Sequence, residues 1–347
     1  MNGSDKRIVK LYLDVTERCN LNCRHCYNGG NAHAQDMSRE LAERIIDEYY
    51  HQGGRELYFS GGEPLLYPDF MSLLRWVDAD YPKMKKYVLT NGTLIDDMFL
   101  SYLQGHRNTM VQISLDGMTP EVHDLQRGHG AFVRTMGNIQ RLRDIAYPNV
   151  MLRMAVNRHN VRELDEILRF AQKIQWIVTF IFVQKLGNAV ENWDDLELSV
   201  QEKLDAAEKI EHFYEGCSYS ASVPSPLYTC SLCNLESKDE RQYSVRTDGK
   251  VVLCSPLTDM PLGDLNVETL SDLNQKDVSE YIRLVDKRRE YLLQGVCKNC
   301  VVKDVCTQGC FGRAHIAGDD LGLDGDCKYR IMDTLKKSIP KILSKRK

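Results

Sequence analysis

The chain has 347 residues, of which 43% are hydrophobic and 27% are charged. This composition is typical of one large or two smaller folded domains and argues against a disordered chain. The net charge of −4 creates no field that would favour nucleic acid or an anionic membrane. The N-terminal residues lack the apolar core of a signal peptide, and the sequence has no 18-residue apolar stretch. We therefore expect a cytoplasmic protein that has neither nucleic acid nor a membrane as a partner.

Runs rich in β-branched residues alternate with helical patterns from residue 8 to about residue 190. Strands are expected at residues 8–15, 55–60, 85–90, 110–116, 150–156 and 178–184. Repeated β-α units of this kind predict an α/β fold with a parallel sheet that curls into a complete or partial TIM-like barrel. An open, doubly wound sheet has the same period and is the alternative.

Two of the intervening helices carry capping signals. Ser38 can cap a helix with one apolar stripe, which consists of Leu41, Ile45 and Tyr49. Asn160 and Glu163 form a variant of the capping box and predict a helix from residue 161 to about residue 171.

The second part of the chain has a different character. Residues 192–215 predict a surface helix preceded by a loop, and the Ser/Pro-rich residues 216–228 predict a linker. Residues 243–254 predict a β-hairpin with its turn at Asp248 and Gly249. We therefore expect a barrel over residues 1–191, a bridging helix and linker over 192–228, a cysteine-rich domain over 229–335 and a basic tail over 336–347.

Twelve cysteines are distributed unevenly along the chain. Three precede residue 30 and nine lie between residues 217 and 327. In a large chain without a signal peptide, such cysteines are more often metal ligands than disulfides. Two separate metal-binding regions are therefore predicted.

The first region is the loop that contains Cys19, Cys23 and Cys26. Three thiolates can bind three irons of a [4Fe–4S] cluster and leave the fourth iron open. A zinc ion with three cysteines and a water molecule is the alternative.

Polar or glycine-rich motifs follow the next strands, at the edge where a parallel β/α sheet carries its functional residues. These motifs are SGGEP (60–64), TNGT (90–93), SLDG (114–117) and VNRHN (156–160). Gly61 and Gly62 let another group approach the backbone closely, and Glu63 offers a carboxylate to an ammonium group. Polar groups that suit a ribose or an amino acid come from Thr90, Asn91, Ser114 and Asp116. Together with the cysteine loop, these motifs predict one site.

The order CNLNCRHC, SGGEP, TNGT and SLDG resembles the radical S-adenosylmethionine superfamily over about the first 190 residues. The resemblance implies a partial (β/α)6 barrel and a [4Fe–4S] cluster on Cys19, Cys23 and Cys26. The open iron would bind the amino and carboxylate groups of S-adenosylmethionine, whose one-electron cleavage yields a 5′-deoxyadenosyl radical that abstracts a substrate hydrogen. The implied contacts with S-adenosylmethionine are Tyr27 near the adenine, Gly61, Gly62 and Glu63 at the amino group, Ser114 at the ribose, Arg127 at the carboxylate and Leu186 on the adenine side.

The C-terminal cysteines resemble the SPASM extension of these enzymes, which holds two auxiliary [4Fe–4S] clusters. The resemblance assigns Cys230, Cys233, Cys254 and Cys310 to one cluster, and Cys297, Cys300, Cys306 and Cys327 to the other. Cys217 is an alternative to Cys230. Three clusters are therefore expected in the whole chain.

Many members of this group modify peptides, so the resemblance implies a peptide substrate that is cross-linked, epimerised or oxidised. It also implies a flavodoxin- or ferredoxin-type electron donor. The first strand begins near residue 8, so we expect any peptide-recognition domain on a separate protein. Ser255 occupies the place of an aspartate that sulfatase-maturing members use as a base, which argues against that activity.

Two other functions remain as alternatives. One is a radical enzyme that acts on a tetrapyrrole or another small molecule, and the other is a non-enzymatic iron–sulfur electron carrier or zinc protein. The sequence names no catalytic acid or base. Three histidines near the motifs, namely His25, His123 and His129, are expected to be polar surface residues.

Overall fold

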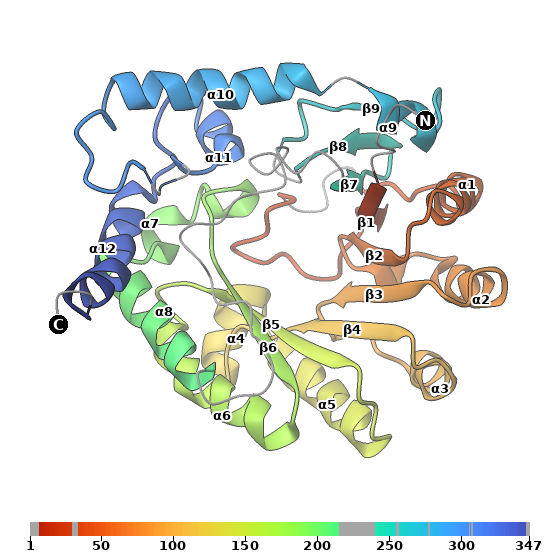
Figure 1. The fold of residues 1–347 in the computed structure, drawn as a ribbon. Helices are drawn as coiled ribbons and strands as arrows, with labels where there is room; N and C mark the ends of the chain where they lie inside the picture. Colours follow the sequence, from red (N-terminus) through yellow and green to blue (C-terminus); the bar gives the residue numbers. More distant parts are fainter. Residues whose placement is uncertain are drawn as a thin grey trace. The chain divides into compact units, whose positions relative to one another are not determined.

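The computed structural model describes residues 7–29, 34–214, 240–254, 257–276, 278–304, 306 and 308–344 (Figure 1). The chain forms two compact units, and each is described by itself. The first contains Met1–Leu196 and Lys238–Lys276, and the second contains Glu197–Ser237 and Asp277–Lys347. In the part of the chain that the structure describes, no helix is long and apolar enough to cross a membrane.

The first unit is built on a curved sheet whose first six strands run parallel in sequential order (Figure 1). A doubly wound sheet reverses its strand order, so the observed order identifies the partial (β/α)6 barrel. The predicted strands are confirmed, with small shifts at their ends. They are β1 (Arg7–Thr16), β2 (Glu56–Gly61), β3 (Lys85–Thr90), β4 (Thr109–Ser114), β5 (Val150–Val156) and β6 (Ile177–Phe182).

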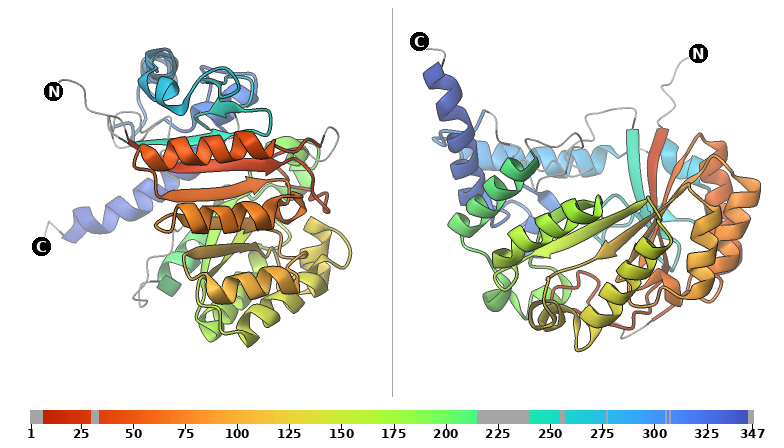
Figure 2. Two further views of the ribbon diagram at one scale, coloured as in Figure 1. Left: turned by 90° about the vertical axis from the view of Figure 1, so that its right-hand side faces the viewer. Right: turned by 90° about the horizontal axis from the view of Figure 1, so that it is seen from below.

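Helices follow the strands and cover the outer face of the sheet, as Figure 2 shows for the first three. The predicted cap at Ser38 is confirmed, because its hydroxyl accepts a hydrogen bond from the backbone N–H of Leu41 at 3.1 Å. The helices are α1 (Arg39–His51), α2 (Phe70–Asp80), α3 (Asp97–Gly105), α4 (Pro120–Arg127), α5 (Ala131–Asp144), α6 (Leu164–Ile174) and α7 (Trp193–Leu196). Short 3₁₀ turns lie at η1 (Pro64–Leu66), η2 (Val161–Glu163) and η3 (Gly187–Ala189).

The two faces of the sheet bury different side chains. Phe59 packs edge-to-face on Phe70 of α2, so the fully buried residues of the strands face the helices. The alternate residues face the inside of the barrel and are only partly buried. Three tyrosines on neighbouring strands, Tyr12, Tyr58 and Tyr87, stack there with ring centroids 4.4 and 4.2 Å apart.

The predicted capping box at Asn160 is wrong. Residues Val161–Glu163 form a 3₁₀ turn, and Asn160 makes no side-chain cap to it. The Asn160 amide instead donates to the backbone carbonyl of Asp116 at 3.0 Å, and the Glu163 carboxylate accepts from the backbone N–H of Met118 at 2.6 Å. Both side chains hold the loop after β4, which a local sequence pattern does not reveal.

The predicted hairpin is confirmed and extends the barrel sheet. Strands β7 (Glu240–Val245) and β8 (Lys250–Val252) pair antiparallel, and Gly249 in their turn has φ +85°. β7 also pairs in parallel with β1, and β9 (Gly263–Asp264) and α9 (Leu270–Gln275) follow. Residues Lys238–Lys276 therefore belong to the first unit, whereas the sequence placed them in the cysteine-rich domain.

The second unit is mostly helical. It contains α8 (Val200–Tyr214), α10 (Ser279–Gln294), α11 (Phe311–Ile316) and α12 (Cys327–Ser344). Helix α8 confirms the helix predicted within residues 192–215, and its Lys203 pairs with Asp326 at 2.7 Å. Residues 336–344 of the predicted tail continue α12. The predicted linker at residues 216–228 lies outside the described residues.

Candidate functional site

The three N-terminal cysteines lie on the loop that follows β1. Cys23 is buried, and Cys19 and Cys26 are partly buried. Burial raises the pKa of the Cys23 thiol to about 12, and the nearby Arg127 guanidinium opposes this rise. The thiols of Cys19 and Cys26 also raise the pKa of Cys23, so the three sulfur atoms lie in one small region. A metal centre that binds here must displace thiol protons from a partly buried site.

The glycines of SGGEP are required by the cysteine loop itself. A Cβ atom on Gly61 would lie 2.1 Å from the carbonyl oxygen of Thr16, and one on Gly62 would lie 2.2 Å from that of Arg18. The backbone N–H of Gly62 donates to Thr16 at 2.7 Å, and that of Glu63 donates to Arg18 at 2.8 Å. The end of strand β2 therefore packs against the cysteine loop, and these contacts hold the backbone just before Cys19 in place.

The LGNA segment holds the other end of the loop. A Cβ atom on Gly187 would lie 2.3 Å from the carbonyl oxygen of Cys26. Asn188 donates from its backbone N–H to Cys26 and from its side-chain amide to the Cys23 carbonyl, both at 2.9 Å. Leu186 is buried beside them. The segment after β6 is therefore part of the same site as the segments after β1 and β2.

Glu63 is fully buried and is held by the TNGT motif. Its Oε1 accepts from the Thr90 hydroxyl and its Oε2 from the backbone N–H of Asn91, each at 2.7 Å. Burial raises the pKa of Glu63 to about 7, although these hydrogen bonds oppose the shift. The Asn91 amide lies 3.9 Å from the sulfur of Cys19. Three sequence-predicted residues are thus brought together next to the first cysteine.

Asp116 and Arg127 form a buried ion pair on the other side of the loop. Nε of Arg127 donates to Oδ2 of Asp116 at 2.6 Å, and its Nη1 lies 4.0 Å from the sulfur of Cys23. Nε2 of His25 lies 3.2 Å from the same carboxylate oxygen. Nδ1 of His123 accepts the backbone N–H of Asp116 at 3.2 Å. Asp116 thus faces protein groups from two segments, α4 and the cysteine loop.

The predicted surface positions of His25 and His123 are therefore wrong. The side chain of His25 is 10% exposed and His123 is fully buried, because both pack around the Asp116 carboxylate and backbone. His129 is exposed, as predicted.

Tyr27 and Ser114 are predicted contacts that are less buried than Glu63 and Asp116. Tyr27 has 44% of its surface exposed, but burial of its hydroxyl end raises the pKa of this phenol, and a hydrogen bond with the Ser60 side chain opposes the rise. Ser114 ends β4 and is partly buried.

Sequence reasoning missed a second buried ion pair beside these residues. Nη1 of Arg246, just after β7, donates to Asp14 at 2.8 Å and to the Asn28 side chain at 3.2 Å. Asp14 lies on β1, and the Asn28 amide donates to the carbonyl of Gly61 at 2.9 Å. The hairpin thus supports the end of the cysteine loop. The only signal was its turn motif, which did not indicate where the hairpin would pair.

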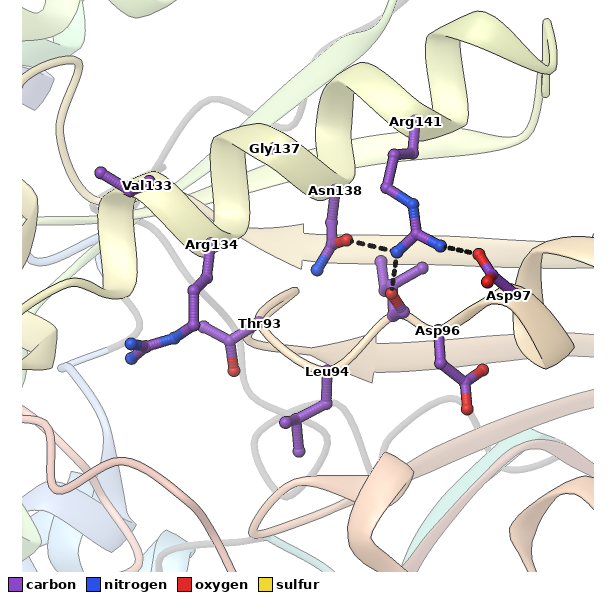
Figure 3. Close-up of a pocket in the computed structure, with 10 residues that line it drawn as sticks. Thr93, Leu94, Asp96, Asp97, Val133, Arg134, Gly137, Asn138 and Arg141 are labelled. Carbon is purple, nitrogen blue, oxygen red and sulfur yellow. Dashed lines mark hydrogen bonds and ion pairs between the residues drawn. The ribbon is translucent and has the colours of Figure 1, made fainter.

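A cavity of about 560 Å³ lies between the loop after β3 and α5 (Figure 3). Arg141 extends across it and bonds to Asn138, to the Ile95 carbonyl and to Asp97. The lining residues are Thr93, Leu94, Ile95, Asp96, Asp97, Val133, Arg134, Gly137, Asn138 and Arg141. None of the predicted cofactor contacts is among them. The cavity therefore borders the TNGT loop, whose Thr93 hydroxyl also accepts from the side-chain amide of Asn20 in the cysteine loop at 2.8 Å.

Four cysteines gather in the second unit. The thiols of Cys300, Cys306 and Cys327 all raise the pKa of Cys297, after burial as the main cause. Cys310 has different neighbours. Its backbone N–H donates to Asp324 at 2.8 Å, and its thiol raises the pKa of Arg313. This grouping is the one expected for the second auxiliary cluster. Cys254 follows β8 in the first unit, and Cys217, Cys230, Cys233 and Ser255 lie outside the described residues.

The donor set fits iron–sulfur clusters. Side-chain N–H groups of Asn91 and Arg127 face cysteine sulfur atoms, as outer groups around Fe–S centres do. Within the described ranges, no three His, Cys, Asp or Glu side chains are arranged to bind a single metal ion. The three cysteines, Glu63, Asn91 and Arg127 are the residues that would surround the N-terminal cluster.

Family models match both parts of the chain. Residues 13–171 match the model of the radical SAM superfamily, and residues 233–301 match an iron–sulfur cluster-binding domain known as SPASM. These ranges contain the N-terminal cysteine loop and part of the C-terminal cysteine array.

Relatives and a solved structure extend over most of the chain. The mycofactocin maturase MftC of Mycolicibacterium smegmatis is 26% identical, with 91% of this chain and 81% of that protein covered. The AdoMet-dependent heme synthase of Methanosarcina barkeri is 28% identical, with 91% and 95% covered. Streptococcus suis SuiB bound to its precursor peptide SuiA has a TM-score of 0.70 at 13% identity, with 92% and 75% covered. The last likeness concerns the fold alone.

Proposed function

Because the chain belongs to the radical S-adenosylmethionine superfamily and carries a SPASM domain, we propose that it modifies a peptide by radical chemistry. The modification is a cross-link, an epimerisation or an oxidation of a side chain. A cluster held by Cys19, Cys23 and Cys26 would supply the electron for reductive cleavage of S-adenosylmethionine, and the resulting 5′-deoxyadenosyl radical would remove a hydrogen atom from the substrate. The protein supplies binding, orientation and exclusion of water.

The residues around the cysteine loop suit these tasks. Glu63, ionised, offers a buried anion to the ammonium group of S-adenosylmethionine, and Arg127 offers a cation to its carboxylate. Tyr27 presents a partly exposed ring where the adenine is expected, and Ser114 presents its hydroxyl where the ribose is expected. We assign three [4Fe–4S] clusters to the chain, with the N-terminal cluster on Cys19, Cys23 and Cys26.

The auxiliary clusters use the C-terminal cysteines as the sequence predicted. One takes Cys297, Cys300, Cys306 and Cys327. Its support is that neighbouring thiols of this set raise the pKa of Cys297 and of Cys327. The other takes Cys230, Cys233, Cys254 and Cys310. A flavodoxin- or ferredoxin-type protein supplies electrons, and a separate protein recognises the peptide.

One observation favours a peptide over a tetrapyrrole. Four arginines lie on the cysteine loop or contact it, and each is paired with an aspartate. The pairs are Arg18–Asp36, Arg24–Asp195, Arg127–Asp116 and Arg246–Asp14. A tetrapyrrole with several propionate groups would need several available cations, whereas Arg127 is the only one of these four arginines that is assigned to a carboxylate, that of S-adenosylmethionine. The heme synthase relative, at a similar identity, makes the tetrapyrrole the second candidate.

The test uses full-length protein reconstituted with iron and sulfide without oxygen. Deuterium-labelled candidate precursor peptides and iron-porphyrin carboxylic acids are incubated with S-adenosylmethionine and a reductant. We expect a mass change and deuterium transfer into 5′-deoxyadenosine only with a peptide. Transfer only from a porphyrin would replace the proposal with the second candidate.

Two controls bear on the clusters. Three clusters correspond to about 12 iron atoms per chain, and the Cys19/Cys23/Cys26→Ala variant should keep about 8. This variant should form no 5′-deoxyadenosine. If it still forms the nucleoside, the N-terminal assignment is refuted.

A further inference from the structure

Asp116 is the centre of a buried network behind the cysteine loop. Its side chain is fully buried, and its Oδ1 accepts the backbone N–H of Ala155 at 2.7 Å. Its Oδ2 accepts from Arg127 at 2.6 Å and lies 3.2 Å from Nε2 of His25. Donors from β5, α4 and the cysteine loop therefore converge on one carboxylate, which faces the protein and not a ligand.

The network contains one anion and one cation. The cation is the Arg127 guanidinium, whose Nε lies 2.6 Å from the Asp116 carboxylate, and the rings of His25 and His123 pack around this pair. The Arg127 guanidinium holds the pKa of Asp116 below its usual range, so this carboxylate stays ionised. Asp116 therefore balances the charge of Arg127 where water is excluded.

Asp116 also fixes the direction of the guanidinium. The guanidinium group is planar, and its Nε–H donates a hydrogen bond to the aspartate. Nη1 lies at the opposite edge of this plane from the Nε–H, and it is 4.0 Å from the sulfur of Cys23. N–H groups and positive charge near a cluster sulfur favour the reduced form of an iron–sulfur cluster. Arg127 therefore raises the reduction potential of a cluster on Cys23, and Asp116 limits that rise.

We propose that Asp116 is a positioning residue that sets the reduction potential of the N-terminal cluster through Arg127. The inference rests on the proposed function, because it takes Cys23 as a cluster ligand. His25 contributes because its Nε2 lies 3.2 Å from the same Oδ2, and this contact helps to keep the carboxylate turned toward Arg127.

The test is an anaerobic redox titration of the reconstituted full-length protein, followed by electron paramagnetic resonance. The N-terminal signal is the one absent from the Cys19/Cys23/Cys26→Ala variant. Asp116→Asn keeps the shape and removes the negative charge, so the midpoint potential should become less negative. Arg127→Gln removes the positive charge, so the midpoint should become more negative. Shifts of opposite sign distinguish this role from simple damage to the site.

Asp195→Asn is the matched control. Asp195 pairs with Arg24 of the same cysteine loop, but half of its side chain is exposed. Water screens such a pair, so its removal should leave the midpoint unchanged. Iron content of each variant is measured in parallel.

Each outcome decides the proposal. Unchanged midpoints in Asp116→Asn and Arg127→Gln, or shifts of the same sign, would overturn it. If Asp116→Asn does not retain iron, Arg127→Gln decides alone, and an unchanged midpoint there overturns the proposal. A native protein that forms no S-adenosylmethionine-responsive cluster would instead overturn the proposed function.

Discussion

S-adenosylmethionine should bind more tightly as the pH rises through about 7, and Glu63 should be the cause. This carboxyl group is fully buried, and burial raises its pKa from 4.5 to about 7. Only the ionised form attracts the ammonium group of the ligand. The free protein must therefore lose a proton from Glu63 before it binds.

The magnitude follows from the titration of one group. With a pKa of about 7, about a tenth of Glu63 is ionised at pH 6 and about nine-tenths at pH 8. The dissociation constant should be about tenfold larger at pH 6, which corresponds to about 1.4 kcal/mol. Folding responds in the opposite direction, because the raised pKa stabilises the ligand-free protein below pH 4.5. This stabilisation of about 3 kcal/mol is lost as the pH rises to about 7.

The assay is equilibrium binding of S-adenosylmethionine to reconstituted protein at pH 6, 7 and 8. Glu63→Gln should lower the affinity at pH 8 and remove the protein's contribution to the pH dependence. Glu163→Gln is the matched control, because Glu163 is also a buried carboxylate that accepts from a backbone N–H and a threonine hydroxyl. The amino group of the ligand titrates equally in all three proteins. Identical pH profiles for native protein and Glu63→Gln would refute the reasoning.

Three further predictions concern folding and cluster loading. Asp324→Asn should lower the iron content by about four atoms or more, because its carboxylate holds a cysteine backbone and two arginines. Asp326→Asn, which pairs with one of the same arginines and with a lysine, should lose less iron. Gly62→Ala should reduce iron at the N-terminal site, because its Cβ would lie 2.2 Å from a backbone oxygen. Gly137→Ala has open space in a helix and should raise stability by about 1 kcal/mol, seen as a higher melting temperature. Lys86→Met should destabilise the protein by about 3–5 kcal/mol in chemical denaturation, because it removes the ammonium partner of the mostly buried Asp78 carboxylate. Equal iron contents of Asp324→Asn and Asp326→Asn, or of Gly62→Ala and Gly137→Ala, would contradict these assignments. An unchanged free energy of unfolding in Lys86→Met would contradict the last one.

The sequence predicted the barrel well because its signals are local. The period of each strand and helix depends on neighbours within a few residues, and the cap at Ser38 spans three positions. The hairpin turn at Asp248 and Gly249 is equally local, and it is present. Its pairing with β1 was not predictable, because the edge of β1 lies more than two hundred residues away along the chain.

The polar residues that surround the cysteines were harder to predict, because their burial depends on distant partners. His25 was expected at the surface because it lies in a loop. Its side chain is instead buried against the carboxylate of Asp116, which follows another strand. Asn160 was expected to cap a helix, and its amide instead supports the loop after β4.

The contrast between Glu63 and Asp116 shows what strand-end motifs can and cannot assign. The sequence predicted both carboxylates as ligand contacts, because both follow strands at the same edge of the sheet. Glu63 is held only by neutral groups, so it keeps a raised pKa and a net charge to offer when ionised. Asp116 is already neutralised by Arg127, so its charge acts on the protein and through it on Cys23. Position at the strand end therefore predicts membership of the site, whereas the partner of each charge determines the role within it.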